Sequence, residues 1–510
     1  MREFRQARWP EPAIYEAGRQ PRREPPILDR DETPTSDAEA LRGIPTHLLR
    51  RTGPHLPALS EVEVVRHFTR LSQATFGVDT GLYPLGSCTM KYSPKVNDAI
   101  ANADAVHWIH PHQEEATVQG ALEIMYTLAQ WLAELTGMHA FTLQPAAGAH
   151  GEYTGALIMR AYHRARGDLA TRRELIVPDS AHGTNFASAA MAGFHVVVVP
   201  SNARGCVDMD ALAGVVSTRT AGLMLTNPNT LGIFEENILE IAQMIHEAGG
   251  LLYYDGANLN AIMGKARPGD MGFDVVHLNL HKTFSTPHGG GGPGAGPVGV
   301  VEALTGFLPV PTVGRDEGRF YLNYDHRQTI GRVGGFYGNF EVLVKAYAYV
   351  RAMGGDGLRR AAELSVLNAN YLAQKIAAIE GFSLPYGRGI PRKHECVISC
   401  AKLHQDTGVT AKAVAKRLLD FGVHAPTMYF PPIVEEALML EPTETESLED
   451  LDRYVEIFAQ IAREAYTDPA VVLEAPHHTT ILALDEVKAS HPRTLCVSWR
   501  MHRSQPAPTP

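Results

Sequence analysis

The chain has 510 residues, enough to bury two substantial hydrophobic cores. Its composition, 45% hydrophobic and 20% charged residues, is that of an ordinary globular protein. The formal net charge of -10 argues against a nucleic-acid or anionic-membrane partner, because such partners favour a basic surface. No apolar run approaches the length of a membrane span, and the first residues lack the hydrophobic core of a secretory signal.

The cysteines are few and widely spaced, and no second Cys or His pair stands at zinc-site spacing from Cys396 and Cys400. We therefore predict no metal site and a reducing, cytoplasmic location. The five are Cys88, Cys206, Cys396, Cys400 and Cys496.

Residues 1–60 are rich in proline and arginine and show no clear periodicity. This composition predicts an extended N-terminal arm, either wrapped around a neighbouring subunit or partly disordered in its first part. A helix is expected next over Ala116–Gly137, where apolar residues recur at spacings of three and four and a glycine follows.

Short β-branched runs then alternate with helical patterns, of which Asn237–Gly249 is the clearest. This alternation predicts a large, mostly parallel α/β domain over residues 61–335, with ligands bound at the carboxyl ends of the strands. The predicted strands are Glu174–Pro178, Phe194–Pro200, Ala221–Thr226, Leu251–Asp255 and Val275–Leu280.

Residues 336–510 have a different rhythm, which predicts a smaller C-terminal α+β domain. The expected elements are a long helix from Phe340 to about Ile379, a strand at Cys396–Cys400, helices at Thr410–Phe421 and Ser447–Ala465, and an irregular tail from about Tyr466.

Lys282 follows the last buried strand directly, and the glycine-rich loop Gly289–Gly294 comes soon after it. Burying an ammonium group is costly, so a lysine at the mouth of a sheet favours the neutral, nucleophilic amine that forms a Schiff base. A surface lysine that begins a flexible loop is the competing interpretation. The two features described next favour the first.

Asp255 ends the preceding strand, one crossover before Lys282. A carboxylate at the end of a strand can pair with a pyridinium nitrogen and keep it protonated, which makes the ring an electron sink. Alone, this residue would more simply be a turn residue before Gly256.

The segment Pro145–Glu152 contains small residues followed by a helical pattern. Small residues allow the backbone to approach an anion, and a helix start offers free N–H groups, so Ala147, Gly148 and Ala149 are expected to bind a phosphate. No Gly-Lys-Ser/Thr follows, and the fingerprint of a dinucleotide site is missing, so a P-loop enzyme and an NAD enzyme are disfavoured.

Two further loops follow strands. His182 could stack on a flat aromatic ring, or it could be one of the many solvent-facing histidines of the chain. Asn227 could hydrogen-bond a ring hydroxyl, or it could belong to an ordinary Asn-Pro turn.

These residues lie in longer motifs that resemble subunit 2 of the glycine cleavage system P-protein family. The resemblance extends from about residue 55 to about residue 490. Its motifs are Tyr83-Pro-Leu-Gly-Ser-Cys-Thr-Met-Lys91, Ser180-Ala-His-Gly-Thr-Asn185, Asn279-Leu-His-Lys-Thr-Phe284, Phe336-Tyr-Gly-Asn-Phe340 and Glu441-Pro-Thr-Glu-Thr-Glu446.

The resemblance implies the fold-type-I architecture of pyridoxal-phosphate (PLP) enzymes. It implies that Lys282 holds PLP, Asp255 pairs with its ring nitrogen and His182 stacks on the ring, and we also assign Ala257 and His281 to this site. The implied reaction is decarboxylation of glycine with transfer of the aminomethyl group to the lipoyl arm of H-protein. The implied assembly is an α2β2 heterotetramer with P-protein subunit 1.

Two alternatives remain open at this point. Another fold-type-I decarboxylase would share the lysine and the aspartate but would release a free amine. A non-catalytic structural subunit is the second alternative, and Lys282 speaks against it because a silent partner is expected to lack that lysine.

Overall fold

The computed structural model describes residues 4–14, 41–50 and 59–492. Contacts divide the chain into two compact units, a large one built mainly from Phe76–His477 and a small one built from Arg5–Thr75 with His478–Ile481. Much of the predicted N-terminal arm, residues 1–3, 15–40 and 51–58, lies outside the described residues.

In the small unit, helix α3 (Glu61–Gln73) begins with a capping box formed by Ser60 and Glu63. Glu11 contacts this helix through its carboxylate, which lies 2.7 Å from Nδ1 of His67 and accepts a hydrogen bond from Arg70 at 3.0 Å. A short 3-10 helix, η1 (Thr46–Leu48), belongs to the same unit.

The large unit contains a seven-stranded sheet in the order β1-β7-β6-β5-β4-β2-β3. Pairings among β2 to β6 are all parallel, whereas β7 runs antiparallel to both of its neighbours, so the predicted, mostly parallel sheet is confirmed. The strands are β1 (Ala140–Thr142), β2 (Glu174–Pro178), β3 (His195–Val199), β4 (Thr220–Leu225), β5 (Leu251–Gly256), β6 (Val275–Leu278) and β7 (Val298–Val300).

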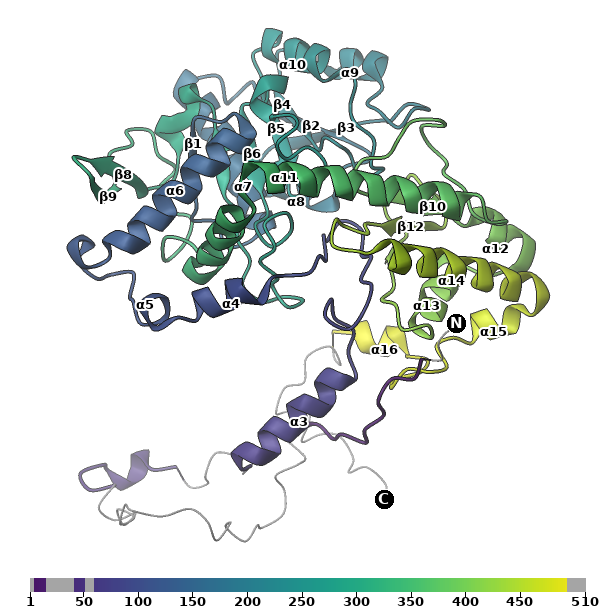
Figure 1. The fold of residues 1–510 in the computed structure, drawn as a ribbon. Helices are drawn as coiled ribbons and strands as arrows, with labels where there is room; N and C mark the ends of the chain where they lie inside the picture. The colour runs from purple at the N-terminus through teal and green to yellow at the C-terminus, as the bar shows by residue number, and fades with distance from the viewer. Residues whose placement is uncertain (1–3, 15–40, 51–58, 493–510) are drawn as a thin grey trace. The chain divides into compact units, whose positions relative to one another are not determined.

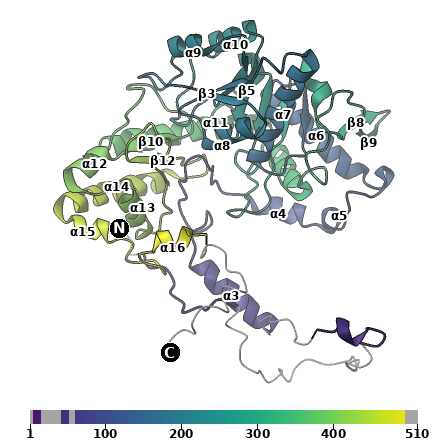
Figure 2. The same cartoon turned by 180° about the vertical axis from the view of Figure 1, so that it is seen from behind.

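Alternating residues of the strands enter two separate cores, one on each face of the sheet. On one face Leu252 and Tyr254 pack with α6 (Gln119–Thr136) and α10 (Ile238–Glu247). On the other face Leu251 and Tyr253 pack with α7 (Gly148–Arg166) and α8 (Gly183–Met191). Figures 1 and 2 show α10 and α9 (Met209–Val215) together at one side of the sheet, from opposite directions.

Shorter elements surround this sheet. A separate two-stranded hairpin, β8 with β9, contacts α6. These elements are α4 (Lys95–Ala101), α5 (Asp104–His107), η2 (Glu115–Thr117), η3 (Pro268–Met271), η4 (Glu302–Phe307), β8 (Thr312–Asp316) and β9 (Arg319–Asn323).

Helix α11 (Phe340–Ala377) leads from the sheet into the C-terminal part of the same unit and is interrupted at Gly354, where φ is 60°. That part contains a three-stranded antiparallel sheet in the order β10-β12-β11. Its elements are β10 (Cys396–Ser399), α12 (Ala401–Thr407), α13 (Ala411–Leu419), β11 (Thr427–Met428), β12 (Ala437–Leu440) and α14 (Leu448–Thr467). The predicted long helix, strand and two later helices are thus confirmed.

The tail predicted to be irregular from about Tyr466 is irregular over residues 474–485 but not throughout. Two short helices lie in this tail, α15 (Pro469–Leu473) and α16 (Glu486–Ser490). Pro469 occupies the first helical position of α15, where its missing N–H costs nothing, and Asp485 caps α16 by accepting a hydrogen bond from Lys488 N. Among the helices that the structure describes, none is both long and apolar enough to cross a membrane.

Candidate active site

A cavity of about 180 Å³ opens at the carboxyl ends of β4, β5 and β6. Strands β5 and β6 are parallel neighbours, with Asp255 opposite His277, so Asp255 and the segment that follows β6 reach the same edge of the sheet. The residues that line the cavity are Ser87, Gly148, Ala149, Glu152, His182, Thr184, Thr226, Pro228, Thr230, Asp255, Ala257, Asn258, Asn279, His281, Lys282, His394 and Glu395.

Asp255 is 3% exposed, yet it is held in its ionised form. Its carboxylate accepts hydrogen bonds from Nδ2 of Asn185 at 2.7 Å and from the N–H of Ala257 at 3.0 Å. Burial opposes ionisation, but these donors and the nearby His277 and Lys282 lower the pKa of Asp255 below its usual value. Burial lowers the pKa of His277 to about 4, so its ring is neutral and the two hydrogen bonds are the main support at neutral pH.

The first turn of α7 forms a second wall. Ala147 is its N-cap residue and Gly148 begins the helix, so unpaired N–H groups are available there. A Cβ atom on Gly148 would lie 2.5 Å from the side chain of Asn279, and one on Gly151 would lie 2.6 Å from the carbonyl oxygen of Gly296. Only glycine allows these close approaches.

His182 caps the start of α8, and its Nδ1 atom lies 2.7 Å from the hydroxyl of Thr184. That hydroxyl donates in turn to Oε1 of Glu152 at 2.7 Å. Burial, with the negative charge of Asp255, raises the pKa of Glu152, whereas burial lowers the pKa of His182. The chain of contacts therefore joins a neutral imidazole to a carboxyl group that favours its protonated form.

The structure brings together seven of the nine residues expected at the site, namely Gly148, Ala149, His182, Asp255, Ala257, His281 and Lys282. Ala147 and Asn227 are not among the lining residues. The Asn227 side chain instead accepts a hydrogen bond from Glu235 N at 2.9 Å, while Thr226, Pro228 and Thr230 of the same loop reach the cavity. The roles of all nine remain predictions.

A cofactor with a phosphate, a flat ring and a ring nitrogen fits this set of groups. Thr226 Oγ1 and Asn279 Oδ1 are buried in the cavity wall without a hydrogen-bond partner among the described residues. Unpaired buried polar atoms are costly, so a bound polar molecule would satisfy them. The start of α7 suits an anion, and ionised Asp255 suits a protonated nitrogen.

Residues 82–91 approach the cavity from far earlier in the chain. Leu85 bridges to Leu440, and Gly86 N donates to the carbonyl oxygen of Met439 at 3.3 Å, so this segment continues the edge of β12. Ser87 and Thr89 both have positive φ values, 67° and 49°, which residues other than glycine rarely adopt.

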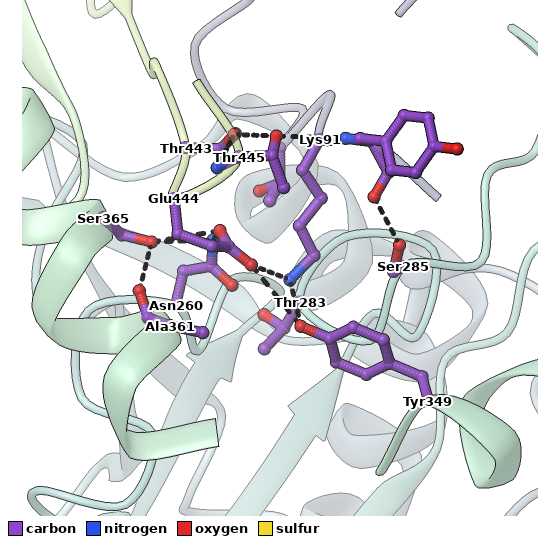
Figure 3. Close-up of polar contacts among 12 residues, drawn as sticks. Lys91, Asn260, Thr283, Ser285, Tyr349, Ala361, Ser365, Thr443, Glu444 and Thr445 are labelled. Atoms are coloured by element: carbon purple, nitrogen blue, oxygen red, sulfur yellow. Dashed lines mark hydrogen bonds and ion pairs between the residues drawn. The ribbon is translucent and has the colours of Figure 1, made fainter. Parts of the chain in front are cut away.

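The end of this segment is fixed by a buried ion pair, drawn in Figure 3. Nζ of Lys91 lies 2.7 Å from Glu444 and donates to the hydroxyl of Tyr349 at 3.1 Å. Asn260 and Ser365 donate to the other oxygen of Glu444, each at 3.2 Å. Although burial opposes it, the charge of Glu444 raises the pKa of Lys91 and keeps the ammonium protonated.

Sequence reasoning missed several residues of the site, including Glu152, Asn185, Glu395 and Glu441. Asn185, Glu441 and Glu152 stood in segments that the sequence analysis singled out, but no role was assigned to any of them. Glu152 lies inside a helix and Glu395 precedes a strand of the C-terminal part, so their approach to Lys282 depends on tertiary packing.

Solved structures of similar fold define the class of the chain. The crystal structure of glycine decarboxylase (P-protein) of the glycine cleavage system, in inhibitor-bound form, aligns with a TM-score of 0.69 at 21% identity, covering 83% of this chain and 95% of that one. Glutamate decarboxylase of Lactobacillus brevis aligns with a TM-score of 0.64 at 17% identity, covering 82% and 96%. The fold is the fold-type-I architecture of PLP enzymes.

Sequence comparison identifies the family. Residues 35–319 match the glycine cleavage system P-protein family, and residues 361–477 match the glycine dehydrogenase C-terminal domain. A probable glycine dehydrogenase (decarboxylating) subunit 2 of Pyrococcus furiosus is 60% identical over 98% of both chains, and that of Caldanaerobacter subterraneus is 57% identical over 93% of this chain and 95% of its own. The chain belongs to the glycine cleavage system P-protein family.

Proposed function

We propose that the cavity around Lys282 binds PLP and that the chain uses it to decarboxylate glycine in the glycine cleavage system. The observation that carries this proposal is the placement of Lys282 and ionised Asp255 at one cavity, at the ends of neighbouring parallel strands, in a chain of the P-protein family. When bound, PLP supplies a ring that withdraws the electrons left on the substrate after CO2 departs.

Each wall of the cavity has a task in this proposal. Lys282 holds the cofactor covalently and releases it to the amine of glycine. The start of α7 binds the phosphate through its N–H groups. Asp255 keeps the ring nitrogen protonated. Thr226 Oγ1 and Asn279 Oδ1, which have no partner among the described residues, would hydrogen-bond to the cofactor.

The chain would act with partner proteins. Its relatives are named subunit 2, which supports a complementary P-protein subunit 1. We propose that the two subunits form an α2β2 heterotetramer and that lipoylated H-protein accepts the aminomethyl group. We further propose three regions along the sequence: an N-terminal arm at residues 1–60, a cofactor-binding domain at residues 61–335 and a smaller domain at residues 336–510. We also propose that the protein works in the cytoplasm.

The test is exchange of labelled bicarbonate into the carboxyl group of glycine, with PLP and lipoylated H-protein present, with and without subunit 1. Exchange that requires both proteins is the expected result. Retention of PLP by the chain, followed by its visible absorbance, should be lost in Lys282→Ala and preserved in Lys265→Ala, whose lysine pairs with Glu363 elsewhere. PLP retention without exchange in any combination would discard glycine decarboxylation.

A further inference from the structure

Two buried glutamates beside Lys282 have no task in the mechanism above. Glu395 directly precedes β10 and Glu441 directly follows β12, and these antiparallel strands pair Cys396 with Leu440. The register therefore brings the two carboxyl groups side by side. They are 5% and 0% exposed, and one oxygen of each lies within 4.8 Å of the other and of a ring nitrogen of His394.

The two carboxyl groups accept different numbers of hydrogen bonds from the residues around them. Glu441 accepts a hydrogen bond on each oxygen, from Asn258 Nδ2 at 2.7 Å and from Thr89 N at 3.0 Å. Glu395 accepts one from Ser87 N at 3.0 Å on Oε2, while Oε1 lies 3.6 Å from Nε2 of His394. Glu395 also lines the cavity that contains Lys282. Glu441 is thus the better supported anion, and Glu395 is the member that faces the substrate space.

The charges nearby favour one shared proton. Burial and the charge of Glu441 raise the pKa of Glu395, and burial raises the pKa of Glu441, while Lys282 opposes both shifts. His394 adds no positive charge, because burial lowers the pKa of its ring to about 3. Cys88, the other titratable neighbour, stays a neutral thiol because burial raises its pKa. Two buried carboxyl groups this close hold one proton and one negative charge near neutral pH.

The other acids of the cavity are already engaged. Asp255 is bound by Asn185 and Ala257 and is assigned to the cofactor ring. Glu152 accepts from Thr184 and Ser188, at 2.7 Å and 3.2 Å. Glu152 also has a raised pKa, but both of its oxygens accept hydrogen bonds, whereas Oε1 of Glu395 accepts none from the described residues and is therefore the oxygen best placed to take up a proton.

We propose that the Glu395–Glu441 pair is the base that removes a proton from the ammonium group of glycine as the substrate enters, with Glu395 as the catalytic residue and Glu441 as its positioning partner. This rests on the proposed function, in which the amine of glycine displaces Lys282 from the cofactor. One N–H bond of the ammonium breaks, its electron pair stays on the glycine nitrogen, and the proton forms an O–H bond on Glu395, in the form of the pair in which Glu395 carries the negative charge and Glu441 the proton. No oxidant or further reactant is required.

The loop from Gly86 to Lys91 is part of the same site, because the N–H groups of Ser87 and Thr89 donate hydrogen bonds to Glu395 and Glu441, respectively. Both residues hold left-handed backbone conformations, and the Lys91–Glu444 pair fixes the end of the loop. The base is therefore built from the C-terminal strands and completed by an N-terminal segment.

The experiment measures the rate at which glycine changes the visible absorbance of the PLP-loaded chain, assembled with subunit 1, from about pH 6 to about pH 10. Without a base, only the free amine of glycine reacts, and its fraction rises about tenfold per pH unit below the amine pKa. The parent rate should level off near neutral pH. Glu395→Gln should be slower by about 10²–10⁴-fold at pH 7 and should keep rising with pH until it approaches the parent.

Glu446→Gln is the matched control, because Glu446 is a half-buried acid of the same segment outside the cavity, and it should keep the parent profile. Glu441→Gln, which leaves Glu395 in place, should move the levelling-off to lower pH because the neighbouring negative charge is gone. A Glu395→Gln profile that superimposes on the parent profile would overturn the proposal. If glycine causes no absorbance change even in the parent, the proposed function fails instead.

Discussion

Asp255 and Glu395 line the same cavity and are both almost fully buried, yet the pKa values of their carboxyl groups are shifted in opposite directions. Asp255 lies at the end of β5 and accepts two short hydrogen bonds beside a neutral histidine, and its pKa is lowered. Glu395 lies before β10, accepts one hydrogen bond and faces a second carboxyl group, and its pKa is raised.

The difference shows that burial alone does not decide the ionisation of a side chain. Burial raises the pKa of both groups, and the donors and neighbouring charges determine the outcome. A site that must hold a permanent charge and also exchange a proton needs both kinds of environment around one lysine. Here the large sheet provides the permanent charge and the C-terminal strands provide the exchangeable proton.

The largest effect on bicarbonate exchange is expected from removing the permanent charge of Asp255. Asp255→Asn should lower kcat for glycine-dependent bicarbonate exchange by about 10³-fold, because a preorganised charge at the reacting ring is lost. The loss should be the same across the pH range, in contrast to that of Glu395→Gln. Asp316→Asn, at an exposed end of β8, serves as the control and should leave kcat unchanged. A loss that recovers at high pH would contradict the distinction between the two acids.

Breaking the ion pair that fixes the connecting loop should mainly cost stability. Lys91→Met leaves Glu444 buried without its counter-charge, which should lower the apparent free energy of unfolding by about 3–5 kcal/mol in urea denaturation. Adding Glu444→Gln to this variant should recover part of the loss, because the uncompensated charge is then removed. Equal stability of the parent and Lys91→Met would show that the pair does not hold the loop.

The two acids should also give stability opposite dependences on pH. A raised pKa in the folded state means that Glu395 contributes stability below its unfolded pKa, about 4.3, and that this contribution is lost as pH rises through its folded pKa. Asp255, with a lowered pKa, contributes above about pH 3.9 and loses its contribution as pH falls through its folded pKa.

The free energy of unfolding, measured by urea denaturation between about pH 5 and about pH 9, should therefore fall more steeply for the parent than for Glu395→Gln, by at most about 1.4 kcal/mol per pH unit. Asp255→Asn should be destabilised relative to the parent throughout this range. Parallel curves for the parent and Glu395→Gln would contradict a raised pKa for Glu395.

The smallest effect concerns the unpaired hydroxyl of the cavity. Thr226→Val should weaken PLP binding by about 1 kcal/mol, because one hydrogen bond to the cofactor is lost. Stability without PLP should be unchanged or slightly higher, since the hydroxyl has no partner among the described residues. Spectroscopic titration with PLP gives the affinity, and unchanged affinity would remove Thr226 from the cofactor site.

Much of the large domain could be predicted because its strands are short apolar runs separated by periodic helices. The expected boundaries of β2 and the adjacency of the Asp255 and Lys282 strands agree with the structure. Local pattern was sufficient there, since each strand and its crossover are contiguous in sequence. Strands β1 and β7, three residues each, were missed because so short a run has no clear period.

The proton-exchanging side of the site could not be predicted in the same way. Glu395 and Glu441 become neighbours only through the antiparallel register of β10 and β12, and Ser87 reaches them from an early segment. Nothing local distinguishes a buried glutamate from an exposed one. The motif at Gly86–Lys91 was recognised, but its contribution through backbone N–H groups has no signature in side-chain identity.

Infrared spectroscopy of the carboxyl groups of the 510-residue chain, from about pH 5 to about pH 9, tests most directly whether Glu395 and Glu441 share a proton while Asp255 stays charged. We expect a protonated carboxyl band that titrates near neutral pH, decreases in Glu395→Gln and in Glu441→Gln, and persists in Asp255→Asn. A band that is unchanged in both glutamate variants, or that disappears in Asp255→Asn, would contradict the division between a charged aspartate and a proton-holding glutamate pair.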